Sequence, residues 1–545
     1  NRMQELVVNK SYNTEIIKNY INQTLQKEEE GIYSINRLSS ITIANQRVSV
    51  EADFIKEMVN MIGEDNLTIF SYMPDYIRFL NKISKDIPII YECVDEHTGF
   101  NHSYATKKLE EEMIQRSSVV ITTADTLFTR KFKLNSRTYL VKNAVNPNYF
   151  SNETAIPKEL SDIKRENKII IGYLGAIANW FDKELLIEVA KKNEHMVFVL
   201  VGTIYIDVSD LKEVENIILL GTKAYDEVPS YLKAFDIGMI PFKMEDIIIN
   251  CNPIKFYEYM AANLPTIATP IPELMEYHDG KMIILAKNAD EFSDGINHLF
   301  NEKISLEYMK KIANENSWAE RVEKIDQIIQ GNLVPEHEQL LFRIENKYNK
   351  YRNIEIIDYL SLEIKALNNL NGVKEELIQL AKKSHSRYIK QQTAKLLIKN
   401  NNYEEGIIFL NPNESLSEWE IFKIYNNNNN RITNLIKAKL KRYVLEHEEA
   451  RQILEDDNDI YSQVELATIL MEYGDIKYAL EKLLFLIKSE PSILKNSIVT
   501  NYYLTIYFLN KRNYKQAKLY WDRLFVLTGE HKETIKIYNF LKHGL

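Results

Sequence analysis

Through the first 330 residues, short apolar runs alternate with longer stretches whose apolar positions recur at helical spacing. The short runs are nearly continuous, which is typical of strands buried on both faces of a parallel sheet. In residues 1–150 we predict strands at 31–35, 67–71, 87–94, 118–122 and 138–142, and helices at 2–25 and 105–116. Residues 46–55 either pair with a strand or lead into a helix that ends near residue 62. This alternation predicts a Rossmann-like α/β domain, and we expect its usual first strand to precede Arg2.

Residues 151–330 repeat this pattern more regularly. The predicted strands are 168–173, 196–201, 217–220, 236–240, 266–268 and 282–285, each followed by a helical stretch. In open α/β sheets, ligands lie beyond the carboxyl ends of the strands. The segments that follow such ends are 172–182, 202–203, 221–225 and 242–255. We therefore expect their polar groups to converge on one crevice, and Gly202 closes a strand where a ligand can approach the backbone.

A helix within residues 250–265, NCNPIKFYEYMAANLP, is predicted to organise this crevice. Asn252 serves as its N-cap and Pro253 as its first helical residue. Asn263 and Pro265 end it. The free N–H groups and the dipole of such a helix start form an anion site.

Two charged side chains extend this prediction. Lys255 adds a positive charge in the first helical turn, where it opposes the dipole, so a bound phosphate would relieve it. One turn later, Glu258 can accept two hydrogen bonds from hydroxyl groups, as a ribose offers. The alternative is a plain crossover helix with a solvated lysine and glutamate.

Residues 331–545 have a different character, because glycine becomes rare and strand patterns stop. The segments 474–479 and 513–517 share a pattern that resembles the second half of a tetratricopeptide repeat, with Ala479 and Ala517 38 positions apart. Residues 402–406 resemble a degenerate copy, and the asparagine run 426–430 reads as a loop. We therefore expect an all-α domain of stacked helix pairs, which would bind a partner or acceptor, or would only buttress the first 330 residues.

One helix of this region is predicted to be basic. Residues 435–445 carry Lys437, Lys439, Lys441 and Arg442. Such a helix would touch an anionic membrane surface peripherally, or would present a solvated face.

Composition narrows the function classes. The chain has 545 residues, is 27% charged and carries a net charge of −9, so no general affinity for nucleic acid is expected. Its two cysteines, Cys93 and Cys251, are far apart and outside any metal spacing, which argues against a disulfide framework or a zinc site. No apolar run approaches the length of a membrane span. We expect a cytoplasmic protein without a bound metal.

Several motifs, in order, resemble a known family. They are GYLGAIANWFD at 172–182, FVLVG at 198–202, LLGTKAYDEVPSYLKAFDIGMIPF at 219–242 and NPIKFYEYMAANLPTIAT at 252–269. These resemble the nucleotide-binding domain of GT-B glycosyltransferases, in particular bacterial family 4-type enzymes of teichuronic acid and exopolysaccharide assembly. In the first half, IIYECVDEHTGF, SVVITTADTLF and LVKNAVNPNYF resemble their acceptor-side domain, and ENSWAERVEKI at 315–325 resembles their closing helix.

The resemblance implies an α/β plus all-α architecture. Its domains would be an acceptor domain at 1–150, a nucleotide-sugar domain at 151–330 and the helical-repeat domain at 331–545. It also implies transfer of a sugar from a nucleoside diphosphate donor, most often UDP, to a hydroxyl group, with retention and without a metal or other cofactor. The acceptor would be a glycan, a lipid-linked molecule or a protein.

The family also assigns roles to residues. Glu258 would hold the ribose, Lys255 would face the diphosphate, and Asp95 would face the acceptor. The other donor-side positions are Gly175, Asn179, Gly202, Thr222, Tyr225, Asn250, Asn252, Pro253 and Ile254. The other acceptor-side positions are Glu96, His97, His102 and Asn143.

Two departures from the family pattern keep an alternative open. Asn250 stands where the family has the first of two glutamates spaced eight positions apart. The basic pair that often clamps the phosphates is replaced by Asn179, Trp180 and Phe181. A non-catalytic scaffold that binds partner proteins is therefore the alternative to an active transferase.

Overall fold

The computed structural model describes residues 15, 18, 22, 25–29, 32–35, 44–63, 67–100, 103–151, 154–301, 306–351, 354–412, 414–490, 492 and 497–542. Most of the predicted helix at 2–25 lies outside these residues, as does His102. Two compact units result: residues 1–100 and 109–357 form the first, and residues 101–108 and 358–545 form the second, here called the helical unit.

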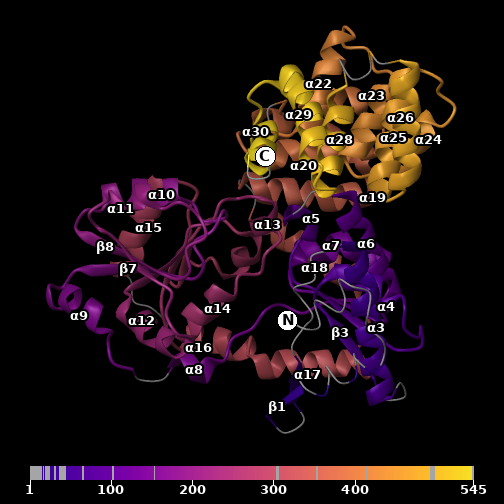
Figure 1. Cartoon of the computed structure of the whole chain (residues 1–545). Coiled ribbons are helices and arrows are strands. Elements are labelled where there is room, and N and C mark those ends of the chain that lie inside the picture. Colours follow the sequence, from indigo (N-terminus) through magenta and orange to yellow (C-terminus); the bar gives the residue numbers. More distant parts are fainter. Residues whose placement is uncertain are drawn as a thin grey trace. The chain divides into compact units, whose positions relative to one another are not determined.

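The first unit contains two parallel sheets, each in its own lobe (Figure 1). The N-terminal lobe has the strand order β3-β4-β5-β6. These strands are β3 (Ile69–Ser71), β4 (Ile89–Cys93), β5 (Val119–Thr122) and β6 (Thr138–Leu140), which confirms four of the predicted strands. The fifth prediction, at 31–35, is β2 (Ile32–Ile35), but it pairs antiparallel with β1 (Leu25–Glu29) in a separate small sheet. Residues 46–55 belong to helix α3 (Ala44–Ile62).

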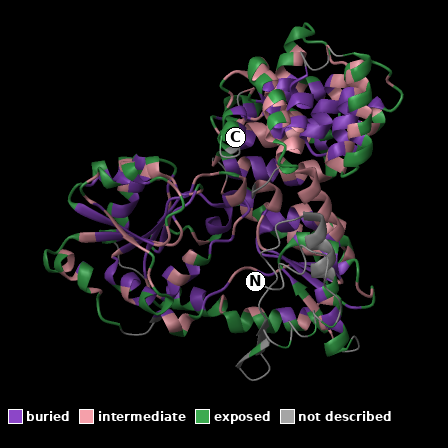
Figure 2. Ribbon diagram, in the orientation of Figure 1, coloured by how far each residue is buried: buried purple, intermediate pink, exposed green. Residues whose placement is uncertain are grey.

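The C-terminal lobe has a six-stranded sheet in the order β12-β11-β10-β7-β8-β9. Its strands are β7 (Ile169–Leu174), β8 (Met196–Val201), β9 (Ile217–Gly221), β10 (Ile237–Ile240), β11 (Thr266–Ala268) and β12 (Ile283–Leu285). All six predicted strands are confirmed, and they lie in the buried interior (Figure 2). The order reverses between β7 and β10, so a crevice opens beyond the carboxyl ends of these two strands.

Helices cover the sheets of both lobes. The helices of the N-terminal lobe are α4 (Ile77–Leu80), α5 (His97–Phe100), α6 (Tyr104–Arg116), whose residues 104–108 belong to the helical unit, and α7 (Asp125–Lys131). Helix α8 (Pro147–Ser151) packs into the core of the C-terminal lobe through Phe150. Those that follow are α9 (Lys158–Arg165), α10 (Lys183–Lys192), α11 (Ser209–Lys212), α12 (Val228–Ala234), α13 (Asp246–Ile249), α14 (Ile254–Ala261), α15 (Ala289–Asn301), α16 (Leu306–Glu315), α17 (Trp318–Ile329) and α18 (His337–Lys350). Short 3-10 helices are η1 (Pro74–Tyr76), η2 (Phe132–Leu134), η3 (Tyr225–Glu227) and η4 (Pro272–Tyr277). The closing helix predicted near 315–325 is α17, whose Ile325 and Ile328 pack against the N-terminal sheet.

Helix α14 is the predicted crevice helix, but its start differs from the prediction. Pro253 occupies the N-cap position, and no side chain caps the helix. The prediction of Asn252 as N-cap is wrong, because its side chain is hydrogen-bonded to Asn143, Tyr257 and Glu273 instead.

The predicted end of α14 is confirmed. Asn263 adopts a φ of 56°, its N–H bonds the carbonyl of Met260, and the N–H of Leu264 bonds that of Tyr259. These paired bonds are the Schellman pattern, in which asparagine is one of the few residues that tolerate the left-handed position.

The helical unit is all-α, as predicted. Its helices are α19 (Glu355–Lys383), α20 (Arg387–Lys399), α21 (Tyr403–Ile407), α22 (Leu416–Asn427), α23 (Asn434–Tyr443), α24 (His447–Leu454), α25 (Ile460–Tyr473), α26 (Ile476–Ser489), α28 (Ile498–Asn510), α29 (Tyr514–Thr528) and α30 (Lys532–Lys542). Ala479 and Ala517, singled out by the repeat pattern, are fully buried in α26 and α29, where small side chains allow close helix packing. No helix among the described residues combines the length and apolarity that a bilayer crossing needs.

The prediction for the basic helix is wrong. In α23, Lys439, Lys441 and Arg442 are buried, so this helix presents them neither to a membrane nor to water. Lys439 pairs with Glu420 at 2.9 Å and with Glu465 at 2.7 Å, and Arg442 pairs with Glu465 at 2.5 Å. Buried cations persist in a protein interior because carboxylates compensate their charge.

Candidate functional site

Two glycines shape the crevice beside β7. Gly175 has a φ of 146°, and a Cβ there would lie 2.1 Å from Cε of Lys255. Gly202 has a φ of 151°, and a Cβ there would lie 1.9 Å from the carbonyl oxygen of Gly175. Both positions require glycine, which is permissive in backbone conformation and leaves room for close approach. The loop after β7 is thereby held directly against the first turn of α14.

Lys255 is the cation that this loop covers. Its Nζ lies 5.7 Å from the centre of the Tyr173 ring and 5.6 Å from that of Phe242. Among the described residues, no carboxylate lies within ion-pair distance of this nitrogen. Burial lowers the pKa of Lys255, and the more distant charge of Glu258 opposes this shift. A half-buried ammonium group without a close counter-ion, at the start of a helix, is a site for an anion.

Glu258 and an aromatic pair form the outer part of the crevice. Glu258 is half-buried, and burial raises the pKa of its carboxyl group. Burial raises the pKa of Tyr225, and the nearby charge of Glu258 raises it further. The exposed Tyr225 ring stacks on Tyr149 at 4.8 Å, and the hydroxyl of Tyr149 donates to the carbonyl of Tyr225 at 2.6 Å. A carboxylate beside an exposed aromatic face suits a ribose and a base.

The other residues predicted on the donor side differ in their exposure. Thr222 is exposed, and its hydroxyl is 3.0 Å from that of Thr203. Ile254 is exposed at the start of α14, Pro253 is buried, and Asn179 is exposed on the loop after β7. Trp180 and Phe181, which stand where the family often has two basic residues, carry no positive charge. Phe181 is buried in the core.

Asn250 is completely buried at the end of α13. Its Nδ2 donates to the main-chain carbonyl of Asp246 at 2.6 Å and to the Asp246 carboxylate at 3.0 Å. Its Oδ1 is buried and has no hydrogen-bond partner in the described part of the chain. Arg130, on α7 of the N-terminal lobe, reaches the same carboxylate at 3.4 Å. Asn250 is therefore tied to the lobe interface through Asp246.

Asn252 joins the start of α14 to the N-terminal lobe. Its Oδ1 accepts from the N–H of Asn143 at 3.0 Å, and its main-chain carbonyl accepts from the Asn143 side chain at 2.7 Å. Its Nδ2 donates to Glu273 at 3.1 Å. Asn143 and Asn252, which were predicted on the acceptor and donor sides, are therefore in contact. Their hydrogen bonds connect the two lobes.

Glu273 is the residue that the sequence analysis missed. It is buried, accepts from the N–H of Asp125 at 2.7 Å and pairs with Lys142 at 3.0 Å. Asp125 in turn pairs with Lys347. No motif marks Glu273, because a glutamate in a 3-10 helix looks like a surface residue until its partners from the other lobe are known.

Asp95 faces the start of α14. It lies two residues beyond β4, is half-buried, and burial raises its pKa while His97 opposes the shift. Cys251, beside Asn250, has its pKa raised to about 12 by burial first and then by Asp95, while Lys255 lowers it. Asp95 of the N-terminal lobe and Lys255 of the C-terminal lobe therefore both lie near Cys251.

The other residues predicted on the acceptor side lie in different environments. Glu96 is buried with Lys131 at 3.4 Å and accepts from Thr98 at 2.7 Å. Despite burial, Lys131 and Arg130 lower its pKa to about 2, so its charge is already compensated. His97 is half-buried, and its Nε2 lacks a hydrogen-bond partner among the described residues. In the part of the chain that the structure describes, no group of three or more His, Cys, Asp or Glu side chains could hold a metal.

Comparison with known proteins identifies the lobe that carries this crevice. The family model of glycosyl transferases group 1 matches residues 168–302. These residues form a group 1 glycosyltransferase domain. The chain is 28% identical over 174 residues to TuaH of Bacillus subtilis (strain 168), named as a teichuronic acid biosynthesis glycosyltransferase. That match covers 30% of this chain and 44% of TuaH, so the chain spans less than half of that relative.

Two solved structures are also similar to part of this chain. Anabaena Alr3699/HepE in complex with UDP is 15% identical, with a TM-score of 0.44 over 53% of this chain and 84% of its own. Sucrose-phosphate synthase of Thermosynechococcus elongatus is 13% identical, with a TM-score of 0.44 over 56% of this chain and 85% of its own. Because these scores are low, the assignment of two Rossmann-like lobes rests on the order of the strands.

Proposed function

We propose that this glycosyltransferase chain moves a hexose from a nucleoside diphosphate donor, with UDP as the nucleotide, to a hydroxyl group of an acceptor. The observation that carries the proposal is Lys255, a half-buried ammonium group without a close carboxylate, covered by the loop at Gly175. Glu258 follows one turn later on the same helix. We assign Lys255 and the start of α14 to the diphosphate, Glu258 to the ribose, and Tyr225 with Thr222 to the base.

In this proposal the residues act on the leaving group. Negative charge grows on the diphosphate as the bond to the sugar breaks, and Lys255 with the amides of α14 stabilises that charge most in the transition state. Asp95, across the crevice, orients the acceptor hydroxyl or takes its proton. We further propose retention of configuration and catalysis without a metal, since Lys255 supplies positive charge at the phosphates.

A second candidate is a non-catalytic scaffold, and Asn250 favours it. At this position a neutral amide replaces the carboxylate of the family, and the amide nitrogen donates a hydrogen bond to the Asp246 carboxylate. Under this alternative the helical unit would carry the function by binding partner proteins.

If the chain is an enzyme, we propose that its acceptor is a glycan, a lipid-linked molecule or a protein, encountered in the cytoplasm or at the inner face of its membrane.

Nucleotide binding by calorimetry tests the proposal. UDP, GDP, dTDP and ADP are titrated into the full chain and into its Glu258→Ala variant. We expect UDP to bind, and the variant to lose about tenfold to hundredfold in affinity, because a hydrogen bond to a charged group is worth about 1.5–3 kcal/mol. Glu188→Ala, which removes an exposed glutamate from α10 of the same lobe, is the matched control and should bind as the parent does.

Release of UDP from UDP-hexoses, by transfer or hydrolysis, then separates the two candidates. Turnover that disappears in Glu258→Ala supports the transferase. Binding of none of the four nucleotides would reject the donor site and leave the scaffold as the better account.

A further inference from the structure

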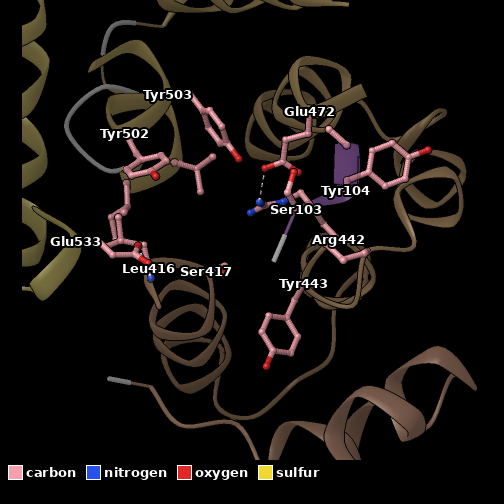
Figure 3. A pocket seen from close by; sticks show the side chains of 14 residues that line it. Ser103, Tyr104, Leu416, Ser417, Arg442, Tyr443, Glu472, Tyr502, Tyr503 and Glu533 are labelled. Carbon is pink, nitrogen blue, oxygen red and sulfur yellow. Dashed lines mark hydrogen bonds and ion pairs between the residues drawn. The ribbon is translucent and has the colours of Figure 1, made fainter. Parts of the chain in front are cut away.

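The helical unit contains a cavity of about 340 Å³ at the ends of several of its helices. Tyr443 and Glu472 come from α23 and α25, Tyr502 and Tyr503 from α28, and Glu533 from α30. Tyr104 of the segment 101–108 completes the wall. Figure 3 shows the paired Glu472 and Arg442 side chains between Tyr503 and Tyr104.

The charge that remains uncompensated in this cavity is negative. The guanidinium group of Arg442 is held by Glu465 at 2.5 Å and by Glu472 at 3.1 Å, so it is already neutralised. Glu533 accepts from the N–H of Leu416 at 3.0 Å and forms no ion pair with any residue that the structure describes. Glu533 and Glu472 both act on Tyr502, whose pKa burial and these two charges raise to about 12.

The adjoining surface already holds basic side chains of this chain. Lys107 Nζ lies 3.1 Å from the Glu446 carboxylate and 3.1 Å from the carbonyl of Leu445. Lys108 Nζ lies 5.2 Å from the centre of the Tyr473 ring. This surface thus contacts one lysine through a carboxylate and another over an aromatic ring.

We propose that this cavity binds a lysine or arginine side chain from a basic peptide segment of a partner protein. Tyrosine rings would surround the alkyl stem and the cation, while Glu533 would supply the counter-charge. A cavity of about 340 Å³ has room for such a side chain and part of its neighbour. The inference goes beyond the proposed sugar transfer, because it concerns recognition of a protein and is read out without turnover.

Fluorescence anisotropy with labelled peptides tests this inference on the full chain. Hexa-lysine and hexa-arginine are compared with hexa-glutamate. We expect the basic peptides to bind and Glu533→Gln and Tyr502→Leu each to weaken them roughly fivefold or more, as the loss of a desolvated cation–π or charge contact implies. Glu533→Gln keeps an acceptor for Leu416, so the helix contact survives.

Matched controls separate the cavity from general charge attraction. Glu530→Gln removes the same charge from an exposed position outside the cavity, and Tyr478→Leu removes an exposed tyrosine of α26. Both should bind hexa-lysine as the parent does. Equal weakening by Glu530→Gln and Glu533→Gln, or no binding of basic peptides by the parent, would overturn the inference. Binding of a neutral hexasaccharide that Tyr502→Leu abolishes, without peptide binding, would assign the cavity to a glycan instead.

Discussion

Lys255 shows how a single residue can indicate a missing ligand. A buried ammonium group costs free energy unless a carboxylate compensates it, and Lys439 of the helical unit has two such partners. Lys255 lies near the faces of Tyr173 and Phe242, and no described carboxylate is within ion-pair distance of its ammonium group. The difference is physical: Lys439 is compensated within the fold, whereas the surroundings of Lys255 support the proposal that it binds an anion.

Replacing Lys255 by methionine should therefore separate activity from stability. We expect kcat to fall about 10²–10³-fold, as the loss of one transition-state donor does, while the free energy of unfolding without ligand stays equal or rises because a desolvated charge is gone. Steady-state kinetics and chemical denaturation of the same preparations provide the measurement. A variant as active as the parent would contradict the role of Lys255.

The lowered pKa of Lys255 also predicts how the affinity for UDP changes with pH. A diphosphate binds the protonated amine better, so the affinity for UDP should decline as the pH rises through the lowered pKa. Lys255→Met should lack this decline.

At the scale of the element, the carboxyl ends of β7, β8 and β9 carry glycines that differ in what surrounds them. A Cβ at Gly202 would strike a main-chain carbonyl, whereas one at Gly175 would strike the flexible end of Lys255. Gly221, at the end of β9, has a φ of 68° and open space around it. Backbone cannot move aside as a side chain can, so the same substitution has three different consequences.

Alanine at each of these positions tests that reading. Gly202→Ala should destabilise the fold by about 3 kcal/mol or more through overpacking against backbone. Gly221→Ala is the matched control for left-handed strain alone, with an expected cost of about 1–2 kcal/mol. Gly175→Ala should cost less than Gly202→Ala, because the end of Lys255 can move aside, although the φ of 146° still strains an alanine. It should also lose UDP affinity, because Lys255 is displaced.

Thermal unfolding and calorimetry on the three variants decide the point. Full UDP affinity in Gly175→Ala would show that the loop and Lys255 are not coupled as described.

At the scale of the whole molecule, a buried cluster joins the two lobes of the first unit beside α14. Glu273 receives the N–H of Asp125, the side chain of Asn252 and the ammonium group of Lys142. Because Asn252 lies two residues before α14, the cluster ties the position of this helix to the opposite lobe. Glu276 also pairs with Lys142, but it is 38% exposed.

Removing Glu273 should loosen both the fold and the site. Glu273→Ala leaves the half-buried Lys142 partly uncompensated and the buried N–H of Asp125 without its acceptor, for which we expect a cost of about 3–5 kcal/mol and faster hydrogen exchange around Asp125. Glu276→Ala is the matched control, with an expected cost of about 1 kcal/mol or less for an exposed pair. Similar losses in both variants would show that Glu273 has no special place between the lobes.

The sequence by itself determined the elements that depend on neighbouring residues. The ten strands of the two parallel sheets, the all-helical region after them and the end of α14 at Asn263 follow from periodicity and backbone preference. Such features need no knowledge of distant residues. For this reason the crevice could be located before its geometry was known.

Only the tertiary structure decided what the charged and amide side chains meet. Asn252 reads as a helix cap but bonds Asn143, 109 positions away, and Lys439 reads as a surface cation but pairs with Glu465, 26 positions away. Glu273 carried no signal, because its partners come from the other lobe. A side chain's partner is set by which elements pack together, and that long-range choice is absent from any local pattern of the chain.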